Sequence, residues 1–257
     1  MFQHQLSTPV KKRSNPASAP SFVMGAGQPL SRSKRAFDIV FCLLALPFLA
    51  LATLFIAVLT TVTSPGPVFF QQERIGYRGR KFKLYKFRTM HASAETASHR
   101  AHFAELVRAK TPMQKMDSRG DARLIPSGWF LRATGLDELP QIINVLRGEM
   151  SVVGPRPCIP YEYEQFTVAQ RERFTAVPGL TGLWQVSGKN RTTFEKMVSL
   201  DIDYARSHSL KLDLRIVALT LPAMALQLSD QVALKRKFRA QSRPHVESTI
   251  HSAQVAR

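Results

Sequence analysis

The sequence has little cysteine and no recognisable metal-binding spacing. Its 257 residues include two cysteines, Cys42 and Cys158, which lie far apart in unlike surroundings. No Cys/His pattern typical of a zinc site accompanies them. This pattern argues against a disulfide scaffold and suits a reducing compartment.

Acidic residues are also scarce. Asp and Glu number 18 against 36 Lys and Arg, a formal net charge of +18. Such a surplus indicates an anionic partner, which could be nucleic acid, anionic lipid or a phosphorylated substrate. No helix-turn-helix, zinc or RNA-binding signature accompanies the charge. We therefore expect no nucleic-acid partner, and keep a basic nucleic-acid-binding protein only as an alternative.

Both ends of the chain lack the pattern of a folded core. Residues 1–31 contain no acidic residue and show no sustained hydrophobic periodicity, which predicts a disordered basic arm. Residues 216–228 form an apolar stretch interrupted by Pro222, too short to span a bilayer and suited to its interface. Residues 229–257 form a basic tail, predicted to be disordered and to contact anionic lipid.

The long apolar run lies at residues 32–63. From residue 36 onward its only charge is Asp38, so it is long enough to cross a bilayer as a single helix. Pro47 interrupts the run, however, and cations lie on both sides of it, which conflicts with the positive-inside bias of a spanning helix. We favour a re-entrant helix that bends at Pro47 and keeps residues 64–228 on the cytoplasmic face.

The body, residues 64–228, alternates predicted strands and helices, which indicates a mixed α/β (α+β) domain. Strands are expected at residues 68–70, 81–88 and 150–153. If the second strand is extended to its end, Lys86 and Arg88 point to one face, where paired cations could hold a diphosphate. The alternative is a solvated basic strand edge.

Two adjacent carboxylates, Asp137 and Glu138, open a predicted helix. Pro140 fits only in a first turn, and the residues after it have the spacing of one buried helix face. A helix N-terminus favours an ionised carboxylate, as a nucleophile or metal ligand requires. The alternative is an ordinary capping Asp beside a solvated Glu. The predicted buried face consists of Leu139, Ile142, Ile143 and Leu146.

Arg156 lies in the stiff turn Gly154-Pro155-Arg156-Pro157. A guanidinium held in this way suits bidentate recognition of phosphate. Pairing with a nearby carboxylate is the alternative.

The motifs, taken in their order along the chain, match the pattern of a known protein family. Along the chain come Lys34-Arg35 with Asp38, Ser64-Pro65-Gly66-Pro67, Tyr85-Lys86-Phe87-Arg88, Leu136-Asp137-Glu138-Leu139-Pro140, Gly154-Pro155-Arg156-Pro157 and Pro178-Gly179-Leu180-Thr181-Gly182. The series resembles the bacterial sugar transferases, the monotopic phosphoglycosyl transferases that act on polyprenyl phosphate. The resemblance covers residues 32 to about 228 and is to the short, exopolysaccharide-initiating type.

The resemblance implies a reaction at the inner membrane. A hexose-1-phosphate passes from a UDP-sugar, UDP-glucose or UDP-galactose, to undecaprenyl phosphate, and UMP is released. It further implies a covalent phosphosugar on Asp137, and Mg²⁺ held by Asp137 and Glu138. The substrate contacts implied by the same matching are Lys86, Arg132, Arg156 and Asp201, with Arg88, Arg74 and Lys189 as weaker candidates.

Three positions depart from the family pattern. Leu46-Pro47 stands where the family commonly has Ser-Pro, Gly135 where many relatives have Ser, and Lys189 where an Arg is frequent. Lys keeps the charge but lacks the bidentate fork of Arg. None of the three departures affects the acidic pair itself. A catalytically inactive membrane scaffold is a second alternative, although it would not need Asp137, Glu138 and Arg156 together, and assembly into a homo-oligomer stays open.

Overall fold

The computed structural model describes residues 30–91, 97–108, 112, 121 and 123–241. The predicted disordered arm falls almost entirely on residues 1–29, outside the described residues, as does the end of the basic tail from residue 242.

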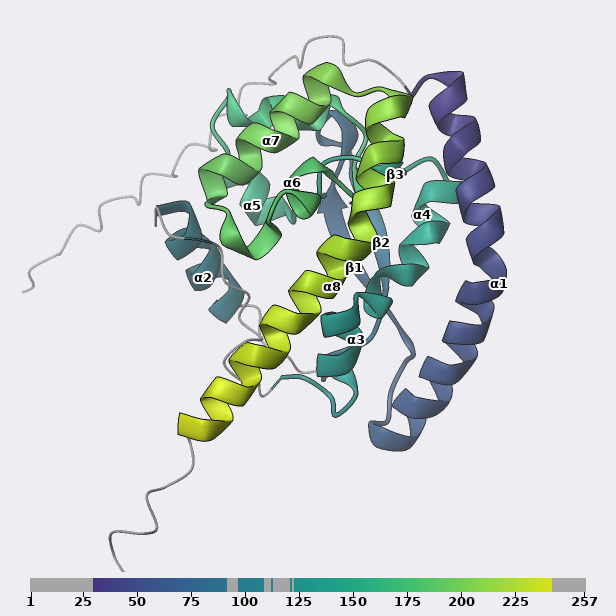
Figure 1. The fold of residues 1–257 in the computed structure, drawn as a ribbon, viewed down its shortest axis with the longest axis vertical. Helices are drawn as coiled ribbons and strands as arrows, with labels where there is room; N and C mark the ends of the chain where they lie inside the picture. The colour runs from purple at the N-terminus through teal and green to yellow at the C-terminus, as the bar shows by residue number, and fades with distance from the viewer. Residues whose placement is uncertain (1–29, 92–96, 109–111, 113–120, 122, 242–257) are drawn as a thin grey trace, which may run out of the picture.

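Helix α1 (Arg32–Thr63) forms one flank of the molecule and bows along the body (Figure 1). It begins where the Ser31 side chain accepts a hydrogen bond from the Lys34 N–H at 3.2 Å, a normal N-cap. The helix continues through Pro47 to Thr63. One face is buried against the body over the whole length of the helix, whereas the opposite face exposes large apolar side chains.

Two small sheets form the framework. Strands β1 (Phe69–Ile75) and β2 (Lys81–Phe87) pair antiparallel around the short turn η1 (Tyr77–Gly79). Strands β3 (Ser151–Val153) and β4 (Gly179–Thr181) pair in parallel. The mixed helix and sheet class expected from the sequence, with an apolar helix at its start, is confirmed.

Glycine is required directly after β3 and at the first residue of β4. A Cβ on Gly154 would lie 2.2 Å from the Val177 carbonyl oxygen, and one on Gly179 would lie 2.0 Å from the Gly154 nitrogen. Only glycine allows two backbones to approach this closely. The turn that carries Arg156 therefore packs directly on the neighbouring chain segment.

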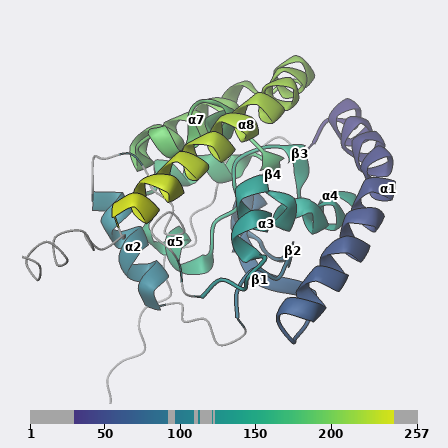
Figure 2. The same cartoon turned by 60° about the horizontal axis from the view of Figure 1, so that its bottom comes forward.

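Helices cover the sheets. Helix α8 crosses the face of the molecule on one side of the strands while α1 flanks the other (Figures 1 and 2). The helical elements after β2 are α2 (Ala97–Arg108), α3 (Gly128–Thr134), η3 (Leu136–Gln141), α4 (Ile142–Leu146), α5 (Pro160–Gln165), η4 (Gln170–Thr175), α6 (Leu183–Val186), η5 (Lys189–Arg191), α7 (Phe194–Ser207) and α8 (Leu210–Gln241).

Helix α8 corrects the prediction for the C-terminal part. The apolar stretch at residues 216–228 is the middle of a 32-residue helix, and residues 229–241 are helical rather than disordered. Pro222 removes one backbone hydrogen bond, but Ala, Leu, Lys, Arg and Gln after it are strong helix formers. Residues 210–234 are long and apolar enough to cross a membrane, as are those of α1, by length and composition alone.

Candidate active site

Four of the predicted site residues meet at one place, and they come from three separate elements. The Lys86 ammonium from β2 lies 2.8 Å from Glu138 Oε1 and 4.0 Å from Asp137 Oδ2. Arg156 Nη2, from the turn after β3, lies 3.2 Å from the same Glu138 oxygen. The arginine–carboxylate pairing considered for Arg156 is therefore present, and its partner belongs to the acidic pair.

The acidic pair lies in the turn between α3 and α4. Gly135 has a left-handed backbone with φ of 73° and separates α3 from η3, and the Glu138 N–H donates to its carbonyl at 3.1 Å. The predicted helix begins as a 3₁₀ turn because Pro140 has no N–H to donate to the Leu136 carbonyl. Regular α-helix starts only at Ile142.

Cations supply the electrostatic field at the pair. Burial by itself would raise the pKa of Glu138, but Lys86, Arg156 and Lys189 outweigh it and hold that pKa well below its usual value. Burial lowers the pKa of Lys86, and both carboxylates of the pair oppose this shift. Glu138 is thus ionised at neutral pH because of its cationic neighbours rather than because of a long helix dipole.

A residue that the sequence did not suggest, Asn144, joins β2 to α4. Its side chain is fully buried; Oδ1 accepts from the Tyr85 N–H at 3.1 Å, and Nδ2 donates to the Lys83 carbonyl at 2.7 Å. These bonds hold β2 beside the acidic pair, and one of them is made by Tyr85, the residue before Lys86. A polar residue within an otherwise apolar helical segment was the available signal.

Arg156 is supported from behind by Arg173 and Asp201. Arg173 donates to the Arg156 carbonyl at 3.1 Å and pairs with Asp201, while the rings of Phe166 and Phe174 lie 5.0 and 5.3 Å from its guanidinium carbon. Asp201 is fully buried, and burial raises its pKa to about 6 although Arg173 opposes the shift. The described partner of Asp201 is thus Arg173, and a contact of Asp201 with substrate stays a prediction.

Arg88 lies elsewhere. Strand β2 ends at Phe87, and the Arg88 N–H still donates to the Val68 carbonyl at 2.9 Å. The Arg88 guanidinium donates to the carbonyls of Pro67 at 2.7 Å and Ser64 at 2.6 Å. Arg88 thus binds the segment where the chain leaves α1, and its contact with a diphosphate stays a prediction.

The remaining candidates lie around the cluster at differing distances. Lys189 is near enough to lower the pKa of Glu138. Arg74 donates to the Pro157 carbonyl at 3.2 Å, next to Arg156 in sequence, and burial followed by the charge of Arg156 lowers its pKa. Arg132 lies in the last turn of α3, and its contact with substrate stays a prediction.

The donor set for a metal is small. Among the described residues, no three His, Cys, Asp or Glu side chains gather into a metal-binding group. Mg²⁺ commonly takes one or two protein carboxylates and completes its shell with substrate phosphates and water. Asp137 and Glu138 fit this pattern, provided that a bound diphosphate supplies further oxygens.

Comparison with known proteins identifies the family. The profile described as bacterial sugar transferase matches residues 30–227, most of the chain. The chain belongs to the bacterial sugar transferase family. It is 39% identical over 208 residues to the exopolysaccharide production protein ExoY of Sinorhizobium fredii, covering 79% of this chain and 90% of the relative. The match to ExoY of Rhizobium meliloti is 38% over 226 residues, or 84% of this chain and 98% of the relative.

A further relative of this sugar transferase is named for its reaction. The UDP-glucose:undecaprenyl-phosphate glucose-1-phosphate transferase of Xanthomonas campestris is 40% identical over 196 residues, which are 73% of this chain and 38% of that longer protein. The predicted family and the prediction of an enzyme that transfers a sugar phosphate are thereby confirmed.

Proposed function

We propose that this sugar transferase moves a hexose-1-phosphate from UDP-glucose or UDP-galactose to undecaprenyl phosphate, and that this starts an exopolysaccharide or another surface glycan. The relatives named for this reaction support the substrate class. The observation that carries the proposal for this chain is the buried Asp137 beside Lys86, Glu138 and Arg156. An inactive scaffold would not need these groups to meet.

The reaction proceeds in two displacements at one phosphorus atom. A carboxylate oxygen of Asp137 attacks the phosphorus that carries the sugar, the bond from that phosphorus to the bridging oxygen breaks, and UMP leaves with the electron pair. An oxygen of undecaprenyl phosphate then attacks the same phosphorus. Asp137 is released as a carboxylate, and the product is undecaprenyl diphosphate-sugar.

The neighbouring side chains prepare this chemistry. Lys86 and Arg156 lie where they can neutralise a diphosphate next to the nucleophile, and Lys189 adds a third positive charge. Glu138 is ionised and accepts from both Lys86 and Arg156, so it holds the two cations together. Mg²⁺, bound by the carboxylates of Asp137 and Glu138 together with the substrate, would supply further neutralisation of the diphosphate.

We also propose that α1 enters the inner membrane from the cytoplasmic side and returns. Both ends of α1 are attached to the same body, through Lys34 to Asp213 and through Ser64 to Arg88. A spanning helix would carry one of these ends across the bilayer. The outward face of α1 exposes ten large apolar side chains, namely Ile39, Val40, Leu43, Leu44, Phe48, Leu51, Leu54, Phe55, Val58 and Val62.

The test is UMP release by the full chain in detergent with undecaprenyl phosphate, Mg²⁺ and a panel of UDP-sugars. We expect one UDP-sugar to give UMP and Asp137→Asn to abolish both UMP release and the covalent adduct, with membrane association unchanged. Asp203→Asn, which alters an exposed carboxylate on α7, is the matched control. UMP release by Asp137→Asn at the rate of the control would refute the assignment of the nucleophile.

A further inference from the structure

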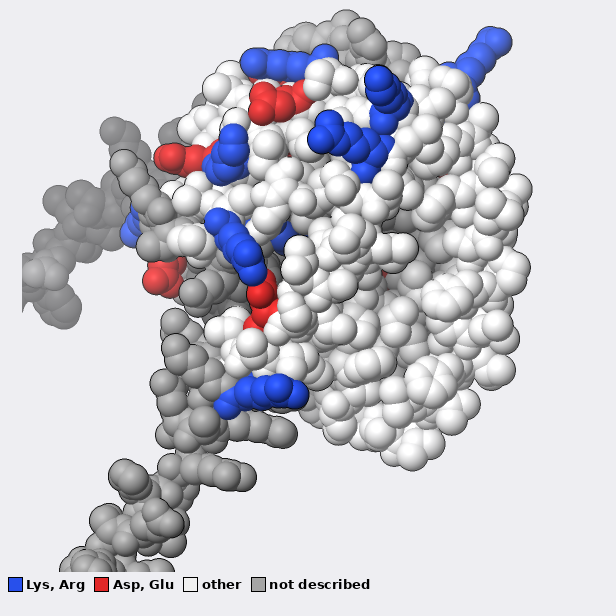
Figure 3. All heavy atoms as spheres, viewed as in Figure 1, with Lys and Arg blue, Asp and Glu red and all other residues white. Residues whose placement is uncertain are grey.

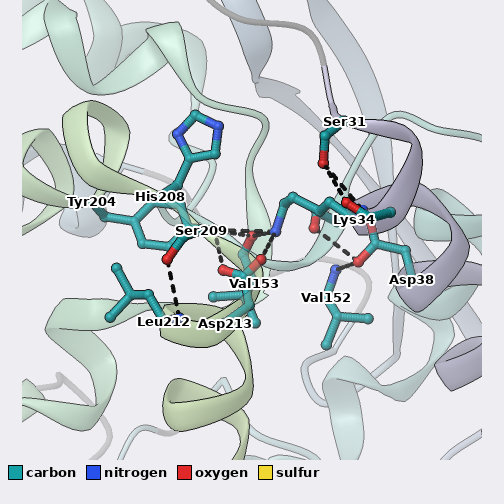
Figure 4. A network of polar contacts seen from close by, with 12 residues as sticks. Ser31, Lys34, Asp38, Val152, Val153, Tyr204, His208, Ser209, Leu212 and Asp213 are labelled. Atoms are coloured by element: carbon teal, nitrogen blue, oxygen red, sulfur yellow. Dashed lines mark hydrogen bonds and ion pairs between the residues drawn. The ribbon is translucent and has the colours of Figure 1, made fainter.

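The first two turns of α1 carry charged residues that are buried in the body rather than exposed. Lys34 is 4% exposed and Asp38 is fully buried. The Lys34 ammonium lies 3.0 Å from the Val153 carbonyl oxygen, 3.1 Å from the Tyr204 hydroxyl and 2.6 Å from Asp213 Oδ2 (Figure 4). These three acceptors use all three of its hydrogens.

The partners of Lys34 also bind one another. The Tyr204 hydroxyl lies 2.7 Å from Asp213 Oδ1 and 2.9 Å from the Val153 carbonyl oxygen. The cluster therefore joins α1, α7, the first turn of α8 and the end of β3. A buried ion pair adds little net stability compared with apolar packing, but it requires one particular geometry. This cluster consequently fixes the placement of α1 on the body.

Two further side chains from the same turns of α1, those of Asp38 and Arg35, bind β3 and α4. Asp38 Oδ1 accepts from the Val152 N–H and the Ser151 hydroxyl, both at 2.9 Å. Arg35 donates to the carbonyls of Val145 at 2.5 Å and Leu146 at 2.7 Å. Those carbonyls lie in the last two residues of α4, where helix carbonyls lack the usual intrahelical donor, and the Val145 carbonyl also accepts from the Gly148 N–H at 2.9 Å.

The two elements bound in this way carry the reacting groups. Strand β3 leads, three residues after Val153, to Arg156, and α4 directly continues the turn that holds Asp137 and Glu138. The spacing of Lys34, Arg35 and Asp38 allows one end of a single helix to bind both elements. Side chains of α1 thus contact the backbone of β3 and α4, and in this way α1 is connected to the catalytic groups.

We propose that Lys34 and Arg35 are positioning residues of the transfer reaction, which make the start of α1 a part of the active-site framework as well as an anchor. The proposal rests on the proposed function for its kinetic consequence. A misplacement of about 1 Å can lower a rate by about 100-fold. Formation of the adduct on Asp137 therefore depends on α1 even when no lipid acceptor is present.

The kinetic test compares Arg35→Met with Arg32→Met, which removes an exposed cation from the same turn of α1. A single turnover is followed with the donor sugar nucleotide that wild type uses, without undecaprenyl phosphate. We expect Arg35→Met to form the adduct at least about tenfold more slowly than Arg32→Met. The UDP-sugar concentration that gives half the maximal rate should agree between the two variants within about twofold. Arg35→Lys should recover part of the rate, because an ammonium can still donate to one carbonyl.

A second variant tests Lys34. Lys34→Met combined with Asp213→Asn removes both charges, so that neither is left buried alone. We expect its KM for the UDP-sugar to rise, because β3 leads to Arg156. If this variant and Arg35→Met are folded and form the adduct as fast as Arg32→Met, the proposal is refuted.

Hydrogen exchange gives a readout that does not require activity. In Arg35→Met, amide exchange should accelerate at residues 136–146, and in the double variant at residues 151–156, relative to Arg32→Met. Unchanged exchange at both segments would refute the coupling. Absence of UMP release from wild type would instead refute the proposed function, while the exchange result would still decide whether α1 holds these segments.

Discussion

Glu138 holds one carboxylate oxygen between two cations that come from different elements. With Lys189 near and Asp137 adjacent, the cluster contains three positive and two negative charges. Its net charge is positive, which suits a phosphorylated substrate. Three of the many basic residues in the sequence thus lie at the acidic pair.

Asp201 gives a pH dependence at the scale of a single residue. Its pKa is raised from 3.8 to about 6, mainly by burial. Between these values the folded chain binds more protons than the unfolded chain, so stability falls as pH rises through this range. The shift corresponds to about 3 kcal/mol when fully developed.

The matching measurement is the melting temperature of wild type and Asp201→Asn from about pH 4 to about pH 7. We expect the advantage of wild type over Asp201→Asn to shrink as pH rises, because only wild type must ionise a buried carboxyl. An advantage that grows with pH would mean that the ion pair with Arg173 outweighs the burial of Asp201.

At the scale of elements, the contact between β2 and α4 depends on Asn144. We expect Asn144→Ala to leave the Tyr85 N–H and the Lys83 carbonyl without partners, at a cost of about 1–3 kcal/mol each. Chemical denaturation should therefore show a large loss of unfolding free energy. UMP release should fall as well, because Lys86 follows Tyr85.

Arg147→Ala is the control for that experiment, since Arg147 follows α4, is exposed, and contacts Tyr85 only through its hydroxyl and ring. Equal losses in the two variants would show that Asn144 does not hold β2 in place.

Pro47 is the other feature at this scale, because it lies inside a helix that bows along the body. Pro47→Leu restores a backbone N–H and removes the clash with the preceding turn, which favours a straighter helix. We expect this variant to shift towards a spanning arrangement, measured by cysteine accessibility labelling of the two termini. Wild-type labelling of both termini would show that contacts with the body, rather than Pro47, determine the path of α1.

At the scale of the whole molecule, charge and apolar surface are separated. In Figure 3 the region over α1, and between α1 and α8, carries almost no charged side chain, whereas Lys and Arg gather over the opposite part of the view. Helix α8 exposes large apolar side chains as well, among them Leu214, Leu221 and Leu226. A surface of this kind fits the interface of a bilayer.

We expect Leu221→Glu to weaken membrane binding, because Leu221 is 75% exposed on α8 and a carboxylate there would have to enter the interface. Co-sedimentation with liposomes of anionic lipid measures the effect. Val168→Glu, at a 61% exposed position between α5 and η4, is the matched control. Equal binding by the two variants would place α8 outside the membrane contact.

Much of the organisation follows from the sequence, since it depends on local patterns. The hairpin of β1 and β2, the apolar helix α1, the stiff turn around Arg156 and the position of the acidic pair in a first turn are all encoded by residues near one another in the chain. The helical continuation of α8 beyond Leu228 does not follow from the sequence pattern, because a basic composition predicts disorder there.

The sequence by itself determined the family, through the order of its motifs, and the identity of the acidic pair with two of its cations, Lys86 and Arg156. Only the tertiary structure separated Arg88 from Lys86, placed Asp201 behind Arg173, and bound Lys34 to Asp213 across 179 positions of the chain. The physical reason is that a residue type and its spacing specify local conformation, whereas the partner of a buried charge depends on which distant segments pack against it.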